Sequence, residues 1–275
     1  MPRQTKTNLK KISRQMRRHI LDMAYRSKTG HIGPALCITD ILAVLYFRIL
    51  NLKPNQPDWP QRDRFILSKG HASAALYAAL ALRGFFHKKI LQSYRVNKGR
   101  LHSHPCNHDV PGIEFSTGSL GHGLPVAAGL ALGLKNERST QIYALLGDGE
   151  CNEGSVWEAA NFIANNSLKN ITAIIDCNNF QGFSAAANID KLPLADKWLS
   201  FGWQVLEVDG HNHQQIERAL ILARQDNAPT AIIAKTINGK GLPAIENTLL
   251  SHYYVLDDKT YQEALKLYRE DARPD

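Results

Sequence analysis

Cysteine is scarce in this sequence, and none of its cysteines is spaced for metal binding. The 275 residues contain four cysteines, and no two of them form a CxxC pair: Cys37, Cys106, Cys151 and Cys177. A disulfide framework and a zinc site of that type are therefore not expected, and free thiols are typical of a reducing compartment. An apolar segment followed by a cleavage site is also missing at the N-terminus. We therefore expect a cytoplasmic protein.

Apolar runs long enough to cross a membrane are missing as well. The run LCITDILAVLYFRIL covers only residues 36–50 and contains Asp40 and Arg48. A membrane-spanning helix needs about 20 predominantly apolar residues. The run is therefore predicted to be a helix of the protein core, and we expect no contact with a membrane.

Acidic residues are outnumbered, and the net charge is +8. Much of the excess lies in the first eighteen residues. A basic arm can bind nucleic acid. Here, however, apolar residues recur at helical spacing and predict one solvated face of an amphipathic helix: Leu9, Ile12, Met16 and Ile20. Because recognition motifs and stacking aromatics do not accompany the charges, we expect no nucleic-acid partner. The charge would also attract phosphorylated metabolites.

Short apolar runs alternate with helical patterns along the chain. Strands are predicted at 64–68, 142–147, 171–176, 204–209 and 230–235, and helices at 9–27, 37–50, 71–83, 120–135, 154–165, 213–226 and 259–270. Most of the strand runs are apolar throughout, as in parallel strands that are covered on both faces. The alternation predicts an α/β fold with a doubly wound, mostly parallel sheet flanked by helices. The length allows one large domain or two small ones.

Two polar side chains follow neighbouring strands of this predicted sheet. Asp148 lies in the run LLGDGE, just after an apolar segment, and Asn178 follows the run ITAIID thirty residues after Asp148. Gly147 and Gly149 let the backbone turn sharply and approach a ligand. A carboxylate oxygen, an amide oxygen and a backbone carbonyl suit Mg²⁺ that also binds a diphosphate, and a helix starting near residue 154 would point N–H groups at the anion. A GDG alone is common in surface turns, whereas this spacing predicts a metal–diphosphate cradle.

The segment LLGDGECNEGSVWEAANFIA…IIDCNNFQG resembles the thiamine-diphosphate motif of transketolases. Other blocks are similar to the family's segments and follow in the family's order: KTGHIGPALCITDIL, RDRFILSKGHASAALYAAL, LHSHPCNHDVPGIEFSTGSLGHGLPVAAGLALG, FGWQVLEVDGHNHQQIERAL and AKTINGKGLPAIENTLLSHYYV. Together they cover about residues 9–270. The resemblance implies the N-terminal, diphosphate-binding subunit of a split, two-chain transketolase. Residues 1–275 would form a single diphosphate-binding domain, in which 236–275 supply a substrate-channel loop and a C-terminal helix.

The resemblance also implies a set of site residues. The metal, Mg²⁺ with Ca²⁺ or Mn²⁺ as alternatives, would be held by Asp148, Asn178 and the carbonyl of Phe180. The thiamine diphosphate would be bound by His71, Gly118, Leu120, Gly147, Asp148, Gly149, Glu150, Asn178 and His252. The catalytic group would comprise His31, His71, His104, His252 and Glu153, the last in a charged network between two active sites. Ketol transfer needs proton donors and acceptors of near-neutral pKa, a role that suits histidine.

The implied enzyme needs partners. A separate C-terminal transketolase subunit would carry the pyrimidine domain and supply a glutamate to the cofactor. Self-association of two such pairs would give a heterotetramer, for which helices 120–135 and 154–165 are candidate contacts or ordinary core helices. The substrates would be sugars or sugar phosphates, with transfer of a two-carbon ketol unit from a ketose donor to an aldose acceptor.

Several positions depart from the family's usual pattern, and most of them fall near the expected substrate channel: Ile32, Pro34, His122, Gly182, Ser251 and Tyr253. We therefore hypothesise a substrate other than the usual pentose phosphates, in a specialised pathway. A 1-deoxyxylulose-phosphate synthase or the α subunit of a 2-oxo-acid dehydrogenase would share the GDG…N cradle, but the SKGHAS and TGSLG blocks favour a transketolase. A non-catalytic scaffold homologue is a further alternative.

Overall fold

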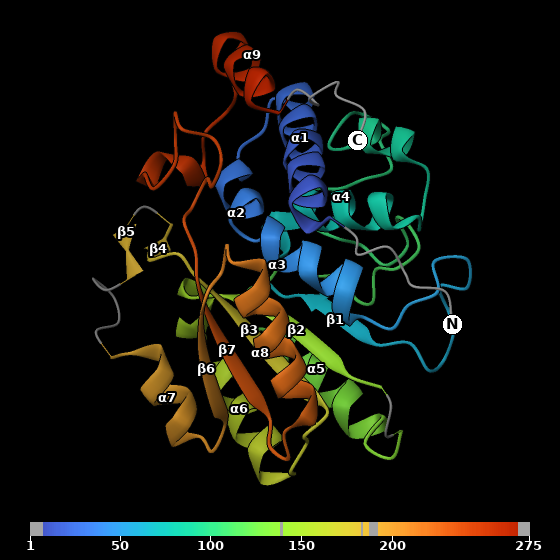
Figure 1. The fold of residues 1–275 in the computed structure, drawn as a ribbon, viewed down its shortest axis with the longest axis vertical. Helices are drawn as coiled ribbons and strands as arrows, with labels where there is room; N and C mark the ends of the chain where they lie inside the picture. Colours follow the sequence, from blue (N-terminus) through green and yellow to red (C-terminus); the bar gives the residue numbers. More distant parts are fainter. Residues whose placement is uncertain (1–7, 138–139, 183, 187–191, 269–275) are drawn as a thin grey trace.

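The structure of the chain is a computed structural model that describes residues 8–137, 140–182, 184–186 and 192–268. Its centre is a five-stranded sheet in which every pair of neighbours is parallel (Figure 1). The strands, in spatial order, are β1 (Arg64–Leu67), β2 (Ile142–Gly147), β3 (Ile171–Cys177), β7 (Thr230–Lys235) and β6 (Gln204–Asp209). The predicted fold class, with a parallel sheet flanked by helices, is confirmed.

Both faces of the inner part of the sheet are buried, which explains why β2, β3 and β7 are almost entirely apolar, whereas the edge strand β6 is largely exposed. Successive side chains of a strand point to opposite faces. In β2, Tyr143 and Leu145 belong to one hydrophobic cluster. Ile142, Ala144 and Leu146 belong to the other. A strand with a polar face would leave one of these clusters incomplete, so the sequence has no alternation here.

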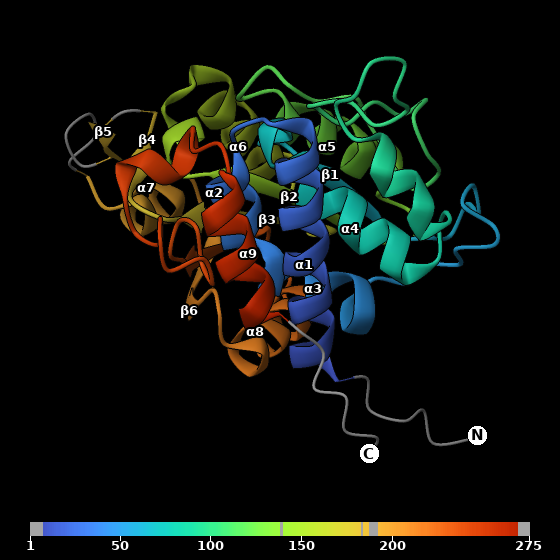
Figure 2. The ribbon, with the colours of Figure 1, turned by 90° about the horizontal axis from the view of Figure 1, so that it is seen from above.

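The helices divide between the two faces of the sheet (Figures 1 and 2). One cluster contains the buried residues of α1 (Leu9–Ser27), α2 (Ile32–Cys37), α3 (Thr39–Val44), α4 (Ser73–Arg83) and α8 (His213–Gln225). The other contains buried residues of α5 (Gly123–Gly133), α6 (Gly154–Asn165) and α7 (Leu194–Ser200). The last helix, α9 (Asp258–Leu267), lies against α1, where the rings of Tyr25 and Tyr261 stack with centroids 3.8 Å apart. In the described part of the chain, no helix is long and apolar enough to span a membrane.

The predicted helix at 37–50 is wrong in its limits. The chain is already helical from Ile32 in α2, it breaks at Ile38, and α3 ends at Val44 in a π turn over Leu45–Ile49. The apolar pattern continues through all these pieces because every residue from Ile32 to Leu45 is buried. Burial on all sides removes the periodicity that would have marked the breaks.

Other elements differ by a few residues or were not predicted. The helix predicted at 71–83 begins with a 3₁₀ turn at Gly70–Ala72, and α5 begins at Gly123 instead of residue 120. Short 3₁₀ turns also occur at Lys88–Ser93, Gly149–Asn152 and Leu249–His252. The hairpin of β4 (Phe180–Gln181) and β5 (Ser184–Ala185) and the seven-residue α7 are too short for a periodic signal. The last residues of the helix predicted at 259–270 lie outside the described part.

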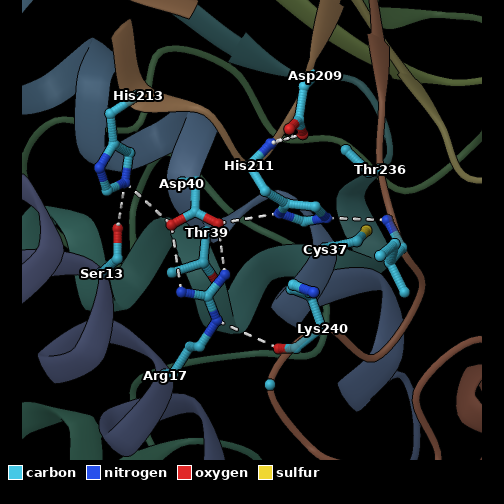
Figure 3. Close-up of polar contacts among 12 residues, drawn as sticks. Ser13, Arg17, Cys37, Thr39, Asp40, Asp209, His211, His213, Thr236 and Lys240 are labelled. Atoms are coloured by element: carbon cyan, nitrogen blue, oxygen red, sulfur yellow. Dashed lines mark hydrogen bonds and ion pairs between the residues drawn. The ribbon is translucent and has the colours of Figure 1, made fainter.

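A buried charged cluster joins α1, α3 and the connection between β6 and α8 (Figure 3). The carboxylate of Asp40 accepts hydrogen bonds from both terminal nitrogens of Arg17, at 3.2 and 2.6 Å. It also lies 2.9 Å from Nδ1 of His211 and 3.0 Å from Nε2 of His213. Burial alone would raise the pKa of Asp40, but these hydrogen bonds and the Arg17 charge hold that pKa well below its usual range. The cluster therefore contains a permanently charged carboxylate.

The same cluster fixes the loop after β7. Nε2 of His211 accepts a hydrogen bond from the backbone N–H of Ile237 at 2.9 Å, so its Nδ1 carries the proton that faces Asp40. Oγ of Ser13 lies 3.0 Å from Nε2 of His213. Because that is the ring nitrogen that also faces Asp40, the three groups do not form a Ser–His–Asp triad, in which the two partners use different nitrogens. We therefore interpret the cluster as a structural connection.

Candidate functional site

Asp148 and Asn178 lie next to each other at the carboxyl end of the sheet. Gly147, the last residue of β2, pairs with Asp176 in β3, so the residues that follow the two strands emerge side by side. Both side chains are buried, each with 6% of its surface exposed. The predicted convergence of a carboxylate and an amide at two neighbouring strand ends is what the structure shows.

Backbone N–H groups orient these two side chains. Oδ1 of Asp148 accepts from the N–H of Gly149 at 2.9 Å, and Oδ2 accepts from that of Asn179 at 2.7 Å. Oδ1 of Asn178 accepts from the N–H of Phe180 at 3.0 Å. Asn179 adopts the left-handed conformation with a φ of 66°, which turns the chain back over the strand ends. Two of the three predicted metal-binding residues, Asn178 and Phe180, thus lie in one tight turn, and the third, Asp148, lies directly beside that turn.

The surroundings of Asp148 suit a cation. Burial, together with the nearby charge of Asp176, raises the pKa of Asp148 to about 6. A divalent ion beside this carboxylate would favour its charged form. Among the described residues, no group of three His, Cys, Asp or Glu side chains could hold a metal by itself. A metal here would therefore need the Asn178 amide, a backbone carbonyl and the oxygens of a ligand, as a metal–diphosphate unit would provide.

A buried ion pair that was not predicted from the sequence supports the side chain of Asn178. Asp176 has no exposed surface and forms an ion pair with Nζ of Lys69. It also accepts hydrogen bonds from Sγ of Cys37 at 3.0 Å and from Nδ2 of Asn178 at 3.0 Å. Burial opposes the charge of Asp176, but Lys69 and these hydrogen bonds lower its pKa below the usual value. A single aspartate at the end of an apolar strand was the signal that could have revealed it.

Glu150 holds three loops together around the strand ends. Its carboxylate is buried and accepts from the N–H of Gly121 at 2.9 Å, from the N–H of Gly147 at 3.1 Å and from the hydroxyl of Ser68. These donors belong to the loop before α5, the end of β2 and the residue after β1. The glutamate of the GDGE sequence therefore stabilises the cradle by joining the loop segments that form it.

Three of the predicted histidines form a compact triangle. The ring centroids of His31 and His71 are 5.4 Å apart, those of His31 and His252 are 5.2 Å apart, and those of His71 and His252 are 5.3 Å apart. Burial lowers the pKa of all three, with that of His252 at about 4 and that of His71 well below its usual value. Near neutral pH these side chains are uncharged imidazoles, each able to donate one hydrogen bond and accept another.

His104 approaches from a different loop. A Cβ built on Gly118 would lie 3.4 Å from the His104 ring, and one built on Gly70 would lie 2.8 Å from Oγ1 of Thr117 and 3.0 Å from the N–H of Gly118. That Thr117 hydroxyl is buried without a hydrogen-bond partner. Burial and the charge of Arg95 lower the pKa of His104. The loops after β1 and before α5 therefore meet closely at Gly70, where a larger residue would clash, and the Thr117 hydroxyl beside it lacks a hydrogen-bond partner.

Two predicted residues lie at the edge of this region. Glu153 is exposed at the start of α6, with its side chain against Gly121, which has a φ of 79°. Leu120 is half-buried in the loop before α5. The structure thus places these two residues beside the loops that form the cradle.

The departures from the family pattern separate into buried and accessible positions. Ile32, Pro34 and Ser251 are buried, so their effect on a channel would be indirect. His122 is exposed ahead of α5, and Gly182 has a φ of 57° in the turn between β4 and β5. Tyr253 is joined to the histidine triangle by ring contacts.

The fold and this geometry define an α/β domain that can hold a metal–diphosphate unit at the ends of two parallel strands. The family described as "Transketolase, thiamine diphosphate binding domain" matches residues 9–271. The chain therefore belongs to the transketolase family and is its thiamine-diphosphate-binding N-terminal part. The predicted family is confirmed.

Known relatives of similar length match almost the whole chain. The 6-deoxy-6-sulfo-D-fructose transketolase subunit SqwG of Clostridium sp. (strain MSTE9) is 41% identical over 88% of this chain and 90% of its own. One of the subunits of apulose-4-phosphate transketolase from Phocaeicola vulgatus is 37% identical over 92% of this chain and 91% of its own. The crystal structure of transketolase from Campylobacter jejuni superposes with a TM-score of 0.90 at 31% identity, over 94% of this chain but only 42% of its own.

Proposed function

We propose that this chain is the cofactor-holding subunit of a two-chain transketolase that becomes active only with a separate C-terminal subunit. One observation carries the proposal: the chain matches relatives named as subunits over 88–92% of its own length and 90–91% of theirs, yet it covers only 42% of the Campylobacter jejuni transketolase. The C-terminal subunit would carry the pyrimidine domain and contribute a glutamate to the cofactor. A cytoplasmic location, expected from the free cysteines, remains a prediction.

In this proposal Asp148, Asn178 and the carbonyl of Phe180 hold Mg²⁺, with Ca²⁺ or Mn²⁺ as alternatives. Bound thiamine diphosphate supplies the carbanion chemistry, and the protein supplies orientation and charge. The remaining cofactor contacts would come from His71, Gly118, Leu120, Gly147, Gly149, Glu150 and His252. The buried Lys69–Asp176 pair, which binds the Asn178 amide, would keep that ligand in place before the cofactor arrives.

The histidines would handle the protons of ketol transfer. Breaking the bond between C2 and C3 of the ketose donor requires removal of a hydroxyl proton, and addition to the aldose acceptor requires its return. His31, His71 and His252 lie within one triangle, and burial keeps their imidazoles neutral, so each offers an unprotonated nitrogen to a sugar hydroxyl. The negative charge of a bound diphosphate would raise their pKa values towards neutrality, where they can take up and return a proton. His104 and Glu153 complete the proposed catalytic group, Glu153 in the network that joins two active sites. Residues 236–275, of which 269–275 lie outside the described part of the chain, would carry the substrate-channel loop and the C-terminal helix in the predicted single domain.

The substrates would be a ketose donor and an aldose acceptor with an anionic end. Two relatives are named for 6-deoxy-6-sulfo-D-fructose and for apulose 4-phosphate, which carry a sulfonate and a phosphate. Those names, together with the departures at Tyr253 and its neighbours, support a specialised sugar as substrate.

The test is reconstitution with the candidate C-terminal subunit. The purified pair, with thiamine diphosphate and Mg²⁺, should transfer a ¹³C-labelled two-carbon unit from a ketose donor to an aldose acceptor. Each chain alone should give no labelled product. Substantial turnover by this chain alone would contradict the two-chain proposal, and evolution of CO₂ from pyruvate by the pair would favour a decarboxylating thiamine enzyme. A pair that binds the cofactor but transfers nothing would indicate a scaffold.

We further propose that two copies of the chain associate through α5 and α6 to give a heterotetramer. A Cβ built on Gly129 or Gly133 meets nothing within 4 Å, so packing within the chain does not require glycine there. Glycine inside a helix costs about 1 kcal/mol relative to alanine, and its presence suits the close approach of a second helix. The same two helices also carry exposed apolar side chains: Leu132 on α5 is 45% exposed and Phe162 on α6 is 42% exposed.

Gly129→Leu should therefore dissociate the proposed tetramer into pairs. The new side chain enters open space in the single chain but would block the approach of a second α5. Sedimentation equilibrium of the assembled enzyme should show the mass fall by about half. Arg218→Leu, on the exposed surface of α8 across the sheet, is the matched control and should keep the wild-type mass. A Gly129→Leu enzyme of unchanged mass would exclude this contact.

A further inference from the structure

Tyr253 lies directly against the histidine triangle, although the proposed mechanism gives it no role. Its ring centroid is 4.6 Å from that of His252 and 5.4 Å from that of His31. The side chain is not part of the core, because 44% of its surface is exposed. An accessible aromatic ring therefore stands beside the two groups that would meet the sugar.

The backbone that carries this ring is held in place by contacts with its neighbours. The N–H of His31 donates to the carbonyl of His252 at 2.9 Å. A Cβ built on Gly30 would lie only 3.0 Å from the carbonyl oxygen of Tyr253, so the two segments are in direct contact. The hydroxyl of Ser251, which is buried, donates to the carbonyl of Thr248 at 2.6 Å and closes the turn that precedes the tyrosine. Tyr253 thus has a fixed backbone on the same frame as the histidines.

The next residue in the chain points elsewhere. The hydroxyl of Tyr254 lies 3.0 Å from Oγ1 of Thr260 and 3.4 Å from Oδ2 of Asp257, at the start of α9. The two neighbouring tyrosines therefore differ in surroundings while sharing their chemistry, and one of them can serve as a control for the other.

The chemistry around Tyr253 suits one wall of a sugar-binding channel. The imidazoles of His31 and His252 are neutral and offer hydrogen bonds to hydroxyl groups. A rigid aromatic ring is a bulky apolar wall, and binding sites commonly combine such walls, which limit the shape of the ligand, with a few polar groups that orient it. A two-carbon aldehyde next to the histidines would be too short to reach past the ring, whereas a five-carbon phosphate would have to pass it.

We propose that Tyr253 is a specificity-determining residue, whose ring narrows the channel beside His31 and His252 and selects aldose acceptors by their length and bulk. The proposal rests on the proposed transketolase function and deepens it. It predicts that the ring lowers kcat/KM for long acceptors and leaves kcat/KM for the shortest acceptor unchanged. One methylene in a fitted pocket changes specificity by roughly ten- to two-hundredfold. Removing a whole ring should therefore change it by at least about tenfold.

The experiment compares two acceptors in the reconstituted enzyme. For Tyr253→Gly, the ratio of kcat/KM for ribose 5-phosphate to kcat/KM for glycolaldehyde should rise by about tenfold. Tyr253→Phe keeps the ring and should leave the ratio within about twofold of wild type. Tyr254→Phe, altered on the side facing α9, is the matched control and should behave like wild type. The affinity for thiamine diphosphate should stay constant in all three, which shows that each variant is folded.

The outcomes separate the two proposals. An unchanged ratio in Tyr253→Gly, with the cofactor bound normally, would overturn the role of Tyr253 while the transketolase function stands. An equal change in Tyr253→Phe would also overturn it, because the hydroxyl and not the ring would then be responsible. If the wild-type pair transfers no ketol unit, the proposed function fails. In that case the role of Tyr253 is tested by calorimetric titration with ribose 5-phosphate alone. Equal affinity in wild type and Tyr253→Gly would refute the proposal that the ring narrows the channel.

Discussion

Asp148→Ala should lower the Mg²⁺-dependent affinity of the assembled enzyme for thiamine diphosphate by more than about a hundredfold. Changing a residue that merely orients a metal ligand costs roughly ten- to a hundredfold in metal affinity, and Asp148 is the one carboxylate in the proposed ligand set. Neither Asn178 nor a backbone carbonyl can replace its charge. The affinity is measured by calorimetric titration of the cofactor at saturating and at zero Mg²⁺.

The matched control is Asp209→Ala. Asp209 ends strand β6 of the same sheet, but its side chain is exposed and accepts from the N–H of His211. That variant should bind the cofactor like wild type. The apo form of Asp148→Ala should not unfold, because burial opposes the charge of Asp148 and raises its pKa to about 6. Cofactor binding of wild-type strength in Asp148→Ala would show that the metal lies elsewhere.

The sheet could be predicted from the sequence because its inner strands are covered on both faces and its edge strand β6 still alternates with helical segments. The runs at 142–147, 204–209 and 230–235 agree with β2, β6 and β7 in both limits. Such strands show their limits through an abrupt change of composition. The segment 32–50 could not be divided correctly, because complete burial removes the pattern that distinguishes one helix from three short pieces.

The candidate site was predictable where it depends on strand ends and not where it depends on distant partners. Asp148 and Asn178 each follow an apolar run, and in a parallel sheet this places them at one edge. Lys69 and Asp176 are 107 residues apart in the chain, and only the tertiary fold brings them together. The contact of Tyr253 with His31 likewise depends on a loop crossing that periodicity does not describe.

The Asp40 cluster is another part that the sequence did not reveal, and it gives the largest expected effect on stability. Arg17→Met should lower the free energy of unfolding by about 3–5 kcal/mol, because it leaves the buried Asp40 carboxylate without its cation. In a protein of this size that corresponds to a fall in melting temperature of roughly 10 °C. The matched control is Arg18→Met. Arg18 pairs with Asp22 on the surface of the same helix, where such pairs contribute about 0.3–0.5 kcal/mol.

The pH dependence distinguishes a lost charge pair from lost packing in Arg17→Met. In wild type the pKa of Asp40 is held far below its usual value, so its charge stabilises the fold above the unfolded-state pKa of about 3.9 and this contribution fades only in stronger acid. Removing Arg17 raises the pKa of Asp40. As the pH falls, the variant therefore binds a proton at Asp40 and regains part of the stability that the unpaired buried charge had cost. The gap in melting temperature between wild type and variant should therefore narrow from pH 7 to pH 4. A gap that stays constant over this range would mean that the charge of Asp40 does not respond to the loss of Arg17, either because His211 and His213 still hydrogen-bond the carboxylate or because Arg17 stabilises the fold through its hydrocarbon stem.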